Sequence, residues 1–276
     1  MMRFLSALVA ILMTLPLLGQ GEGNEFSTLK GELKIADTLG GEAVARRVAL
    51  GWAKLAPGIK ISIETITLLE AIERGGFDVI LYRVNPLEDH VLEPGGEKSL
   101  YAVESALVFA HEKNPRNSIS MAELSDIFSG EIDTWLDITG EGYSIRRYAV
   151  VRPAAGEAVF RELVMGQLEL TESLRRTVSA VETAANCGGS EYAIGVAGYI
   201  AELPENVKLL SVENVTPSLE NIASGEYPLT LRRMAALESG SDLGALFIAY
   251  LTSEQVKGIF AEFDLPPAAA VEKDEK

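Results

Sequence analysis

The chain has 276 residues, with 24 lysines and arginines against 40 aspartates and glutamates, for a formal charge of −16 at pH 7. Hydrophobic residues make up 47% and charged residues 23% of the sequence, which is typical of a globular protein with a sizeable core. The acidity argues against nucleic acid and against an anionic membrane surface as partners. The single cysteine, Cys187, excludes an intrachain disulfide and a cysteine-cluster metal site.

The first 21 residues predict a secretory signal peptide. Arg3 precedes an apolar run from Phe4 to Leu18, and small and polar residues follow it, which is the pattern of an export signal. A run of about 15 apolar residues is short for a membrane span, so an uncleaved anchor is the less favoured interpretation. We expect cleavage between Gly19 and Gly23, and a mature bacterial protein that is periplasmic or secreted and has no membrane span.

Short apolar runs then alternate with amphipathic stretches. Residues 42–58 predict a helix, because apolar residues recur there at helical spacing and Pro57-Gly58 ends it. The order strand, helix, strand, helix, strand indicates an α/β protein with a mostly parallel sheet covered by helices. Strands are predicted at 32–38, 59–66, 77–84, 104–113, 148–153, 192–199, 207–212 and 227–237, and helices at 42–58, 68–76, 121–130, from about 156 to 185, and 244–263.

Four phrases from the middle of the chain onward carry a resemblance. FSGEIDTW runs from Phe128 to Trp135, and AIGVAGY, TPSLENI with SGEYPL, and LTSEQVKGIF follow in that order. In order and spacing these phrases resemble the phosphate-binding proteins of bacterial ABC importers, and the similarity extends from about Gly31 to Pro267. The resemblance implies a two-lobed periplasmic-binding-protein fold of type II. Each lobe is then a mixed, mostly parallel sheet flanked by helices, and two crossover strands join the lobes.

The same resemblance implies the domain organisation. Lobe 1 is expected at residues 27–105 plus 227–267, lobe 2 at 106–226, and a disordered tail at 268–276. The crossovers are expected in 104–113 and 227–237. The ligand is expected between the lobes, which close on it by a hinge motion.

The first expected binding phrase is ADTLGGE, which keeps Asp37 and Thr38 but lacks the Gly-Ser that precedes them in relatives. Thr38 is interpreted either as an anion donor or as a plain helix cap. The second phrase, ETITLLEAI, keeps Thr65 and Thr67 but has lost a glycine. These two threonines are interpreted either as strand threonines without a ligand, or one of them as the cap of the following helix.

The third phrase is FDVILYRVNPL, which retains Asp78 and Arg83. Leu81 and Tyr82 replace small residues of the relatives, and we expect them to narrow the pocket. Arg83 is interpreted either as a cation in the cleft or as a solvated or salt-bridged arginine.

The fourth phrase is VVRPAAGEAVF, where relatives have an arginine followed by Ser-Gly-Thr. Arg152 and Gly156 match that pattern, whereas Ala155 and Glu157 stand where the serine and threonine would be. A carboxylate at this position repels a bound anion. Glu157 therefore either turns outward, or the ligand is not phosphate, or small-anion binding has been lost.

No catalytic motif, metal site or cofactor site is visible, and we expect no enzyme activity. His90 is flanked by acidic residues that are interpreted as loop charges rather than metal ligands. His111 is interpreted as an ordinary strand-end histidine, and Cys187 as a small buried thiol.

The sequence therefore predicts an exported, monomeric solute-binding protein that takes a small oxyanion such as phosphate, with an ABC permease as candidate partner. The expected ligand-binding residues are Asp37, Thr38, Thr65, Arg83, Arg152 and Gly156. The alternative is an exported scaffold or sensor accessory on the same fold whose cleft has lost small-anion binding. A hydrolase on this framework is the least favoured hypothesis, because no nucleophile and base are paired in the sequence.

Overall fold

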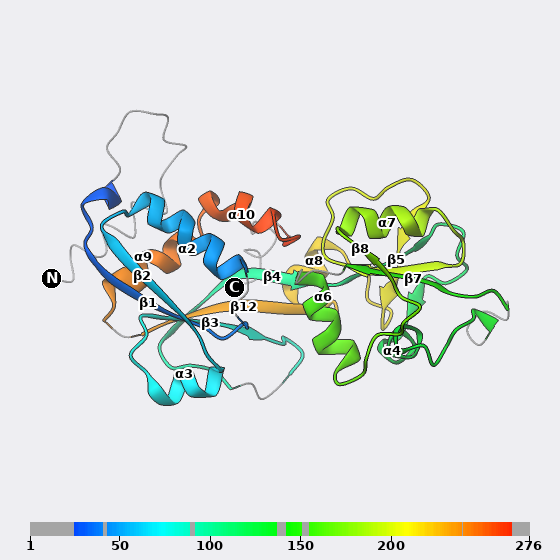
Figure 1. Cartoon of the computed structure of the whole chain (residues 1–276), viewed down its shortest axis with the longest axis horizontal. Coiled ribbons are helices and arrows are strands. Elements are labelled where there is room, and N and C mark those ends of the chain that lie inside the picture. Colours follow the sequence, from blue (N-terminus) through cyan, green and yellow to red (C-terminus); the bar gives the residue numbers. More distant parts are fainter. Residues whose placement is uncertain are drawn as a thin grey trace. The chain divides into compact units, whose positions relative to one another are not determined.

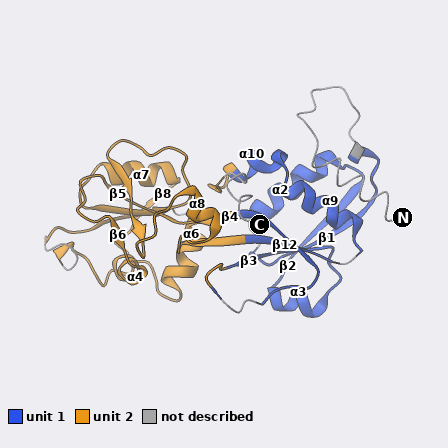
Figure 2. Ribbon diagram, turned by 180° about the vertical axis from the view of Figure 1, so that it is seen from behind, with its two compact units in different colours: residues 1–84, 88–102, 233–260 blue, residues 85–87, 103–232, 261–276 orange. Residues whose placement is uncertain are grey.

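The computed structural model of the chain describes residues 25–40, 43–88, 92–136, 142–150, 155–238 and 240–266. These residues form two compact units, coloured separately in Figure 2. Unit 1 consists of the described residues within 1–84, 88–102 and 233–260, and unit 2 of those within 85–87, 103–232 and 261–276. The expected signal peptide, the expected tail and Arg152 lie outside the described residues.

Unit 1 is built on a five-stranded sheet in the order β2-β1-β3-β12-β4. Strand β1 is parallel to both of its neighbours, β2 and β3. Parallel strands need crossover connections, and the helices between these strands supply them. The strands are β1 (Gly31–Asp37), β2 (Ile59–Thr65), β3 (Val79–Val84), β4 (Glu97–Ser105) and β12 (Thr230–Leu237).

Helices cover both faces of this sheet, as Figure 1 shows: α2 (Ala43–Leu55) and α9 (Asp242–Leu251) on one side and α3 (Leu68–Arg74) on the other. Trp52 of α2 is fully buried, and its ring centroid lies 5.3 Å from that of Tyr250 and 6.3 Å from that of Phe247 on α9. Burial of such large aromatic side chains is a major stabilising contribution. The other helical segments with residues in unit 1 are η1 (Glu25–Thr28), η3 (Glu254–Val256) and α10 (Lys257–Ala261).

Unit 2 has its own five-stranded sheet, in the order β10-β5-β9-β7-β8. Strand β7 is parallel to β8 and β9, whereas β5 is antiparallel to β9 and β10, so the sheet is mixed. These strands are β5 (Leu107–His111), β7 (Arg146–Val150), β8 (Arg175–Thr177), β9 (Ala193–Ala197) and β10 (Val207–Leu209). A separate pair of short parallel strands consists of β6 (Ser118–Ile119) and β11 (Ser211–Val212).

Helices also lie on both faces of the second sheet (Figure 1). Thr177 of β8 hydrogen-bonds Thr183 of α7 (Oγ1···Oγ1, 2.6 Å), whereas Arg147 of β7 donates to the carbonyl of Ile127 in α4 from the opposite face. The helical segments of this unit are α4 (Met121–Ser129), α6 (Ala155–Phe160), the π-turn η2 (Arg161–Met165), α7 (Ala180–Gly188) and α8 (Leu219–Ser224). The α/β class and the mixed sheets predicted from the sequence are confirmed.

Four predicted elements are wrong in extent. The strand expected at 207–212 is divided at Leu210 into β10 and β11, which belong to different sheets. The helix expected from about 156 to 185 ends after η2, because Gly166 has φ +56° and residues 175–177 pair with β7 as an edge strand. The helix expected at 244–263 is divided near Thr252 and Ser253 into α9 and α10. The strand expected at 104–113 is divided at Ala106 into β4 and β5.

The composition of the two units differs from the expected lobe limits. We expected residues 85–87, 103–105, 227–232 and 261–267 in lobe 1, whereas their described parts group with unit 2. Hydrogen bonds explain this grouping. Ala106 donates its N–H to the carbonyl of Leu229 at 3.0 Å, and Tyr199 donates its N–H to the carbonyl of Asp264 at 3.2 Å. Among the described helices, none is long and apolar enough to cross a membrane.

Candidate functional site

The carboxyl ends of the first three strands of unit 1 bring four of the predicted site residues to one edge of the sheet. Asp37 at the end of β1 is in register with Thr65 at the end of β2 and with Leu81 in β3. Thr38 follows Asp37 directly, and Arg83 lies two residues beyond Leu81. In open α/β sheets, ligands bind outside the carboxyl ends of the strands.

Asp37 is fully buried and shapes the turn after β1. Its Oδ1 accepts the backbone N–H of Leu39 at 3.0 Å. A side chain that hydrogen-bonds the backbone two residues ahead stabilises a tight turn. Asp37 therefore holds the conformation in which Thr38 is presented.

Thr38 uses its hydroxyl proton within unit 1. Its backbone N–H and its Oγ1 both donate to the carbonyl of Leu81, at 3.1 and 2.9 Å. The helix-cap interpretation of Thr38 is wrong, because α2 begins at Ala43, five residues later. Since a hydroxyl has one proton, Thr38 donates to an anion only if it releases Leu81.

The two threonines of the second phrase, Thr65 and Thr67, have different structural roles. Thr67 is the N-cap of α3, where its Oγ1 accepts the backbone N–H of Glu70 at 3.2 Å. Of the two interpretations of this pair, the one in which a threonine caps the helix is therefore correct, for Thr67. Thr65 ends β2 with an exposed side chain, which leaves it accessible at the sheet edge.

In the third phrase, Arg83 is half-buried at the end of β3, while Leu81 and Tyr82 are fully buried. Burial, with a smaller contribution from the charge of Glu93, raises the pKa of Tyr82 to about 12.

Asp78 lies at the opposite end of the strand. Its carboxylate accepts the N–H of Lys34 at 2.7 Å and the hydroxyl of Ser241 at 2.6 Å, so its role is to join β1, β3 and the start of α9.

In unit 2, Gly156 lies close to the backbone of Ala197 and Gly198. A Cβ on this glycine would lie 2.2 Å from the nitrogen of Gly198 and 2.5 Å from the carbonyl carbon of Ala197. The start of α6 thus rests directly on the chain that leaves β9. Arg152, the other predicted site residue of this unit, lies outside the described residues.

Glu157 forms an ion pair with Arg161, in which Oε1 accepts a hydrogen bond from Nε. The Glu157 side chain is 20% exposed and the Arg161 side chain 41%. Sequence reasoning missed Arg161, although the spacing of four residues between opposite charges in a predicted helix is a signal for such a pair. A Cβ on Gly198 would lie 2.8 Å from the Cβ of Asp264, so the chain at Asp264 packs against the chain that leaves β9.

Other polar candidates have structural roles. His111 is buried at the end of β5, and its Nδ1 accepts the N–H of Lys113 at 3.1 Å. Burial raises the pKa of the Cys187 thiol to about 12. Within the described ranges no group of three His, Cys, Asp or Glu side chains is placed to hold a metal ion, and His90 lies outside them.

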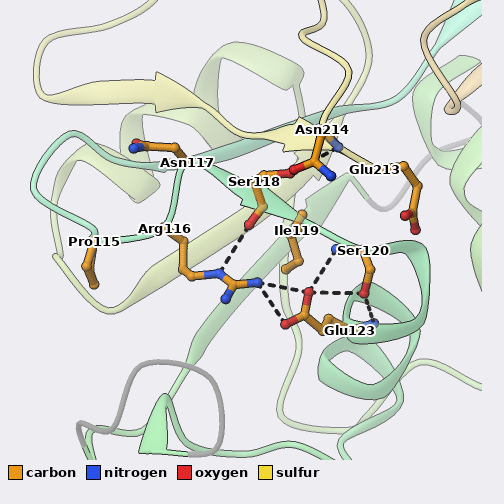
Figure 3. Close-up of a pocket in the computed structure, with 9 residues that line it drawn as sticks. All are labelled: Pro115, Arg116, Asn117, Ser118, Ile119, Ser120, Glu123, Glu213 and Asn214. Carbon is orange, nitrogen blue, oxygen red and sulfur yellow. Dashed lines mark hydrogen bonds and ion pairs between the residues drawn. The ribbon is translucent and has the colours of Figure 1, made fainter.

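A polar pocket of about 390 Å³ lies elsewhere in unit 2 and contains none of the predicted site residues (Figure 3). Its side chains largely satisfy one another. Arg116 donates to both carboxylate oxygens of Glu123, at 2.8 and 2.9 Å, and Glu213 accepts the N–H of Met121 at 2.7 Å. The charged side chains Arg116, Glu123 and Glu213 of this pocket are thus engaged with the protein itself.

Comparisons with known proteins identify the family. A family model described as a PBP superfamily domain matches residues 53–255. The phosphate-binding protein PstS of Bacillus subtilis (strain 168) is 26% identical over 144 residues, which make up 50% of this chain and 46% of that protein. The chain thus matches about half the length of this curated relative.

Solved structures show the same fold. A possible phosphate binding protein from Planctomyces limnophilus DSM 3776 superposes with a TM-score of 0.71 at 17% identity, over 89% of this chain and 96% of that one. An ABC-type phosphate transport receptor from Vibrio cholerae has a TM-score of 0.62 at 17% identity, over 84% of this chain and 98% of that one. PstS from Borrelia burgdorferi has a TM-score of 0.63 at 16% identity, over 86% of this chain and 99% of that one. These relatives are described as binding proteins or receptors rather than enzymes, and this chain belongs to the PBP superfamily, with the two-lobed α/β fold of periplasmic binding proteins.

Proposed function

We propose that this chain is an exported solute-binding protein of an ABC importer and that it takes a small oxyanion such as phosphate. The membership in the PBP superfamily supports a binding role. The names of three relatives, which describe phosphate binding or phosphate transport, support this ligand class. Periplasmic or secreted localisation, a permease partner and a monomeric state are parts of the same proposal.

The observation that carries the proposal is the arrangement at the carboxyl edge of the unit 1 sheet. Asp37, Thr38 and Thr65 lie side by side there through the register of β1 and β2, and the half-buried Arg83 ends β3 at the same edge. A guanidinium with nearby hydroxyl and amide groups is suited to an oxyanion. Arg152 and Gly156 are the residues that unit 2 contributes in this proposal.

The mechanism proposed is binding followed by closure. The chain passes between the units in β4 and β12, whose residues divide between them. Strand segments that join two compact units are suitable hinges. Binding and closure require no covalent step, so the proposal needs no catalytic residue, metal or cofactor.

Calorimetric titration of residues 22–276 with phosphate, sulfate and molybdate tests the proposal. We expect saturable heat with phosphate below millimolar concentration, and a loss of at least tenfold in affinity in Arg83→Gln or Arg152→Gln, since removing a charged partner of a bound anion costs about 1.5–3 kcal/mol. Arg176→Gln is the matched control, because Arg176 is exposed on the edge strand β8. No heat with any of the three anions at millimolar concentration contradicts the proposal.

A second candidate is the exported scaffold or sensor accessory. Two observations favour it: the Thr38 hydroxyl donates to Leu81, and Ala155 brings no hydroxyl to the start of α6. Permease and ATPase genes beside the gene for this chain favour the importer, and their absence together with silent titrations favours the scaffold.

A further inference from the structure

Helix α2 of unit 1 presents a row of exposed side chains that we call the basic stripe. It consists of Arg46, Leu50 and Lys54, which follow one another at intervals of four residues, and Leu50 is 60% exposed. Residues four apart lie on one face of a helix. The opposite face of α2, which includes Val48 and Trp52, is buried, and α2 lies beside α9 on one side of the sheet (Figure 1).

The two cations of the basic stripe are not neutralised by the protein itself. Helix α2 contains no acidic residue, and neither Arg46 nor Lys54 forms an ion pair with another described residue. A nearby exposed cation, Lys60 on β2, does pair, with Glu32 at 3.0 Å. Since the chain has 40 acidic residues against 24 basic ones, a helix face that carries positive charge alone differs from the chain as a whole.

Lys30 extends the positive charge beyond the end of the helix. This lysine is exposed, and its Cγ would lie 3.5 Å from a Cβ on Gly58, which follows the last residue of α2 by three positions. Like the cations of the basic stripe, Lys30 forms no ion pair with another described residue. The positive surface therefore includes both the helix and the chain at its carboxyl end.

Helix stability does not account for the basic stripe. The helix dipole favours Lys54 in the last turn, but Arg46 is the fourth residue of α2, near the end where the dipole favours a carboxylate. Leu50 gains little burial, and a polar side chain suits an outward-facing position better. A partner explains both residues, because a cation and an exposed leucine gain contact free energy when a complementary surface covers them.

We propose that this chain docks through the basic stripe on the extracytoplasmic loops of an integral membrane protein, the permease of the function proposed above. The inference rests on that proposed function. Lysine and arginine are concentrated in the cytoplasmic loops of membrane proteins, so the acidic residues of their extracytoplasmic loops are left without basic neighbours. Such a surface is complementary in charge to Arg46 and Lys54, and an apolar contact at its centre covers Leu50.

An anionic lipid surface is the other occupant that exposed positive charges attract. The net charge of −16 disfavours lipid, because an extended surface of like charge repels the protein as a whole. A contact with a loop is local, and charges farther away than about 10 Å are screened by salt. Treatment of the membrane with protease removes a loop partner and leaves a lipid partner intact, so the two occupants are separable.

Uptake of radiolabelled phosphate by right-side-out membrane vesicles, prepared from the organism that encodes this chain, tests the surface. The chain without its expected signal peptide is added as wild type, Arg46→Glu/Lys54→Glu, Leu50→Ser and the matched control Arg146→Glu/Arg176→Glu. The two control arginines are exposed on β7 and β8 of unit 2 and form no ion pair with a described residue, so the control changes the charge equally. The half-maximal concentration of added protein is measured, and calorimetry gives the phosphate affinity of each variant.

We expect the half-maximal concentration to rise at least about tenfold in Arg46→Glu/Lys54→Glu and about threefold in Leu50→Ser, since a few charged and apolar contacts carry most of a docking free energy. Added salt should raise the wild-type value but not that of the charge-reversed variant. The control should stay within about twofold of wild type, and the phosphate affinity should be the same in every variant, because the basic stripe is distant from the ligand in this proposal.

Wild-type values in Arg46→Glu/Lys54→Glu or in Leu50→Ser, or an equal loss in the control, overturn the inference while phosphate binding stands. Sedimentation of wild type with protein-free vesicles of phosphatidylcholine and phosphatidylglycerol, or undiminished binding to protease-treated membranes, assigns the basic stripe to lipid and overturns the inference as well. A wild type that binds no phosphate overturns the proposed function and the inference with it. If the charge-reversed variant does not fold, Arg46→Gln/Lys54→Gln takes its place, and an unchanged half-maximal concentration there overturns the inference.

Discussion

The carbonyl oxygen of Leu81 accepts two hydrogen bonds from Thr38, one from the backbone N–H at 3.1 Å and one from the hydroxyl at 2.9 Å. This fork joins the end of β1 to β3 at the edge where the predicted site residues gather. It gives Thr38 a structural role in unit 1. Any role of its hydroxyl in anion binding requires a change of hydrogen-bond partner.

Thr38→Val should destabilise the protein by about 1 kcal/mol, because it removes the hydroxyl bond and keeps the shape of the side chain. Thr38→Ser should remain within about 0.5 kcal/mol of wild type, since the donor is retained. Urea denaturation followed by circular dichroism measures both variants. Thr65→Val, at an exposed position of the same edge, is the control and should have little effect on the midpoint.

Gly156→Ala should destabilise unit 2 by about 1–3 kcal/mol, since the new methyl group would meet the backbone of Gly198 at 2.2 Å and forces a displacement. Gly142→Ala is the matched control, because nothing lies within 4 Å of a Cβ at that position. Thermal unfolding of the two variants measures the difference. Equal melting temperatures for both variants contradict the close approach of α6 to the end of β9.

Arg147→Lys should cost about 2–3 kcal/mol, because the buried guanidinium donates to three backbone carbonyls, to Ser173 and to Asp133, and a lysine cannot reproduce this planar set. Arg146→Lys changes the adjacent, exposed residue of the same strand and should stay within about 0.5 kcal/mol. Urea midpoints of the two variants provide the comparison. A similar small effect in both would show that the network contributes little to stability.

Cys187 should resist alkylation by iodoacetamide in the native protein at pH 9 and react readily in urea. Burial raises the pKa of its thiol from 9.0 to about 12, and the thiolate is the reactive form. The same shift has a consequence for stability. The folded state favours the neutral thiol. The stability that the protein gains from this preference is fully present below about pH 9 and is lost as the pH rises toward 12. A native protein labelled at the rate of the unfolded one would contradict the buried position.

The elements predicted best were those with complete local signals. Ser120 with Glu123 forms a capping box at the start of α4, and Gly130, with φ +94°, ends that helix. Both signals are visible in the sequence phrase that begins at Ser120, and the predicted helix at 121–130 differs from the observed one by a single residue. Local capping chemistry needs no tertiary context.

The predicted helix from about 156 to 185 failed for the opposite reason. Its middle contains Arg175, Arg176 and Thr177, which pair with β7 as an edge strand. Helical propensity there is overridden by a partner that is distant in the sequence. The break at Ala106 between β4 and β5 has the same origin, because Leu229 binds its N–H.

The alternation of apolar strands with amphipathic helices determined the α/β class, because hydrophobic periodicity and turn residues are local properties. The order of four phrases carried the resemblance to periplasmic binding proteins. The expected binding phrases also identified residues at the ends of β1, β2 and β3. Only the tertiary structure decided what these side chains do. The Thr38 proton is donated to Leu81, and the charge of Glu157 is met by Arg161. The reason is physical: a hydrogen bond or ion pair depends on register, rotamer and burial, and these exist only once the strands and helices have packed.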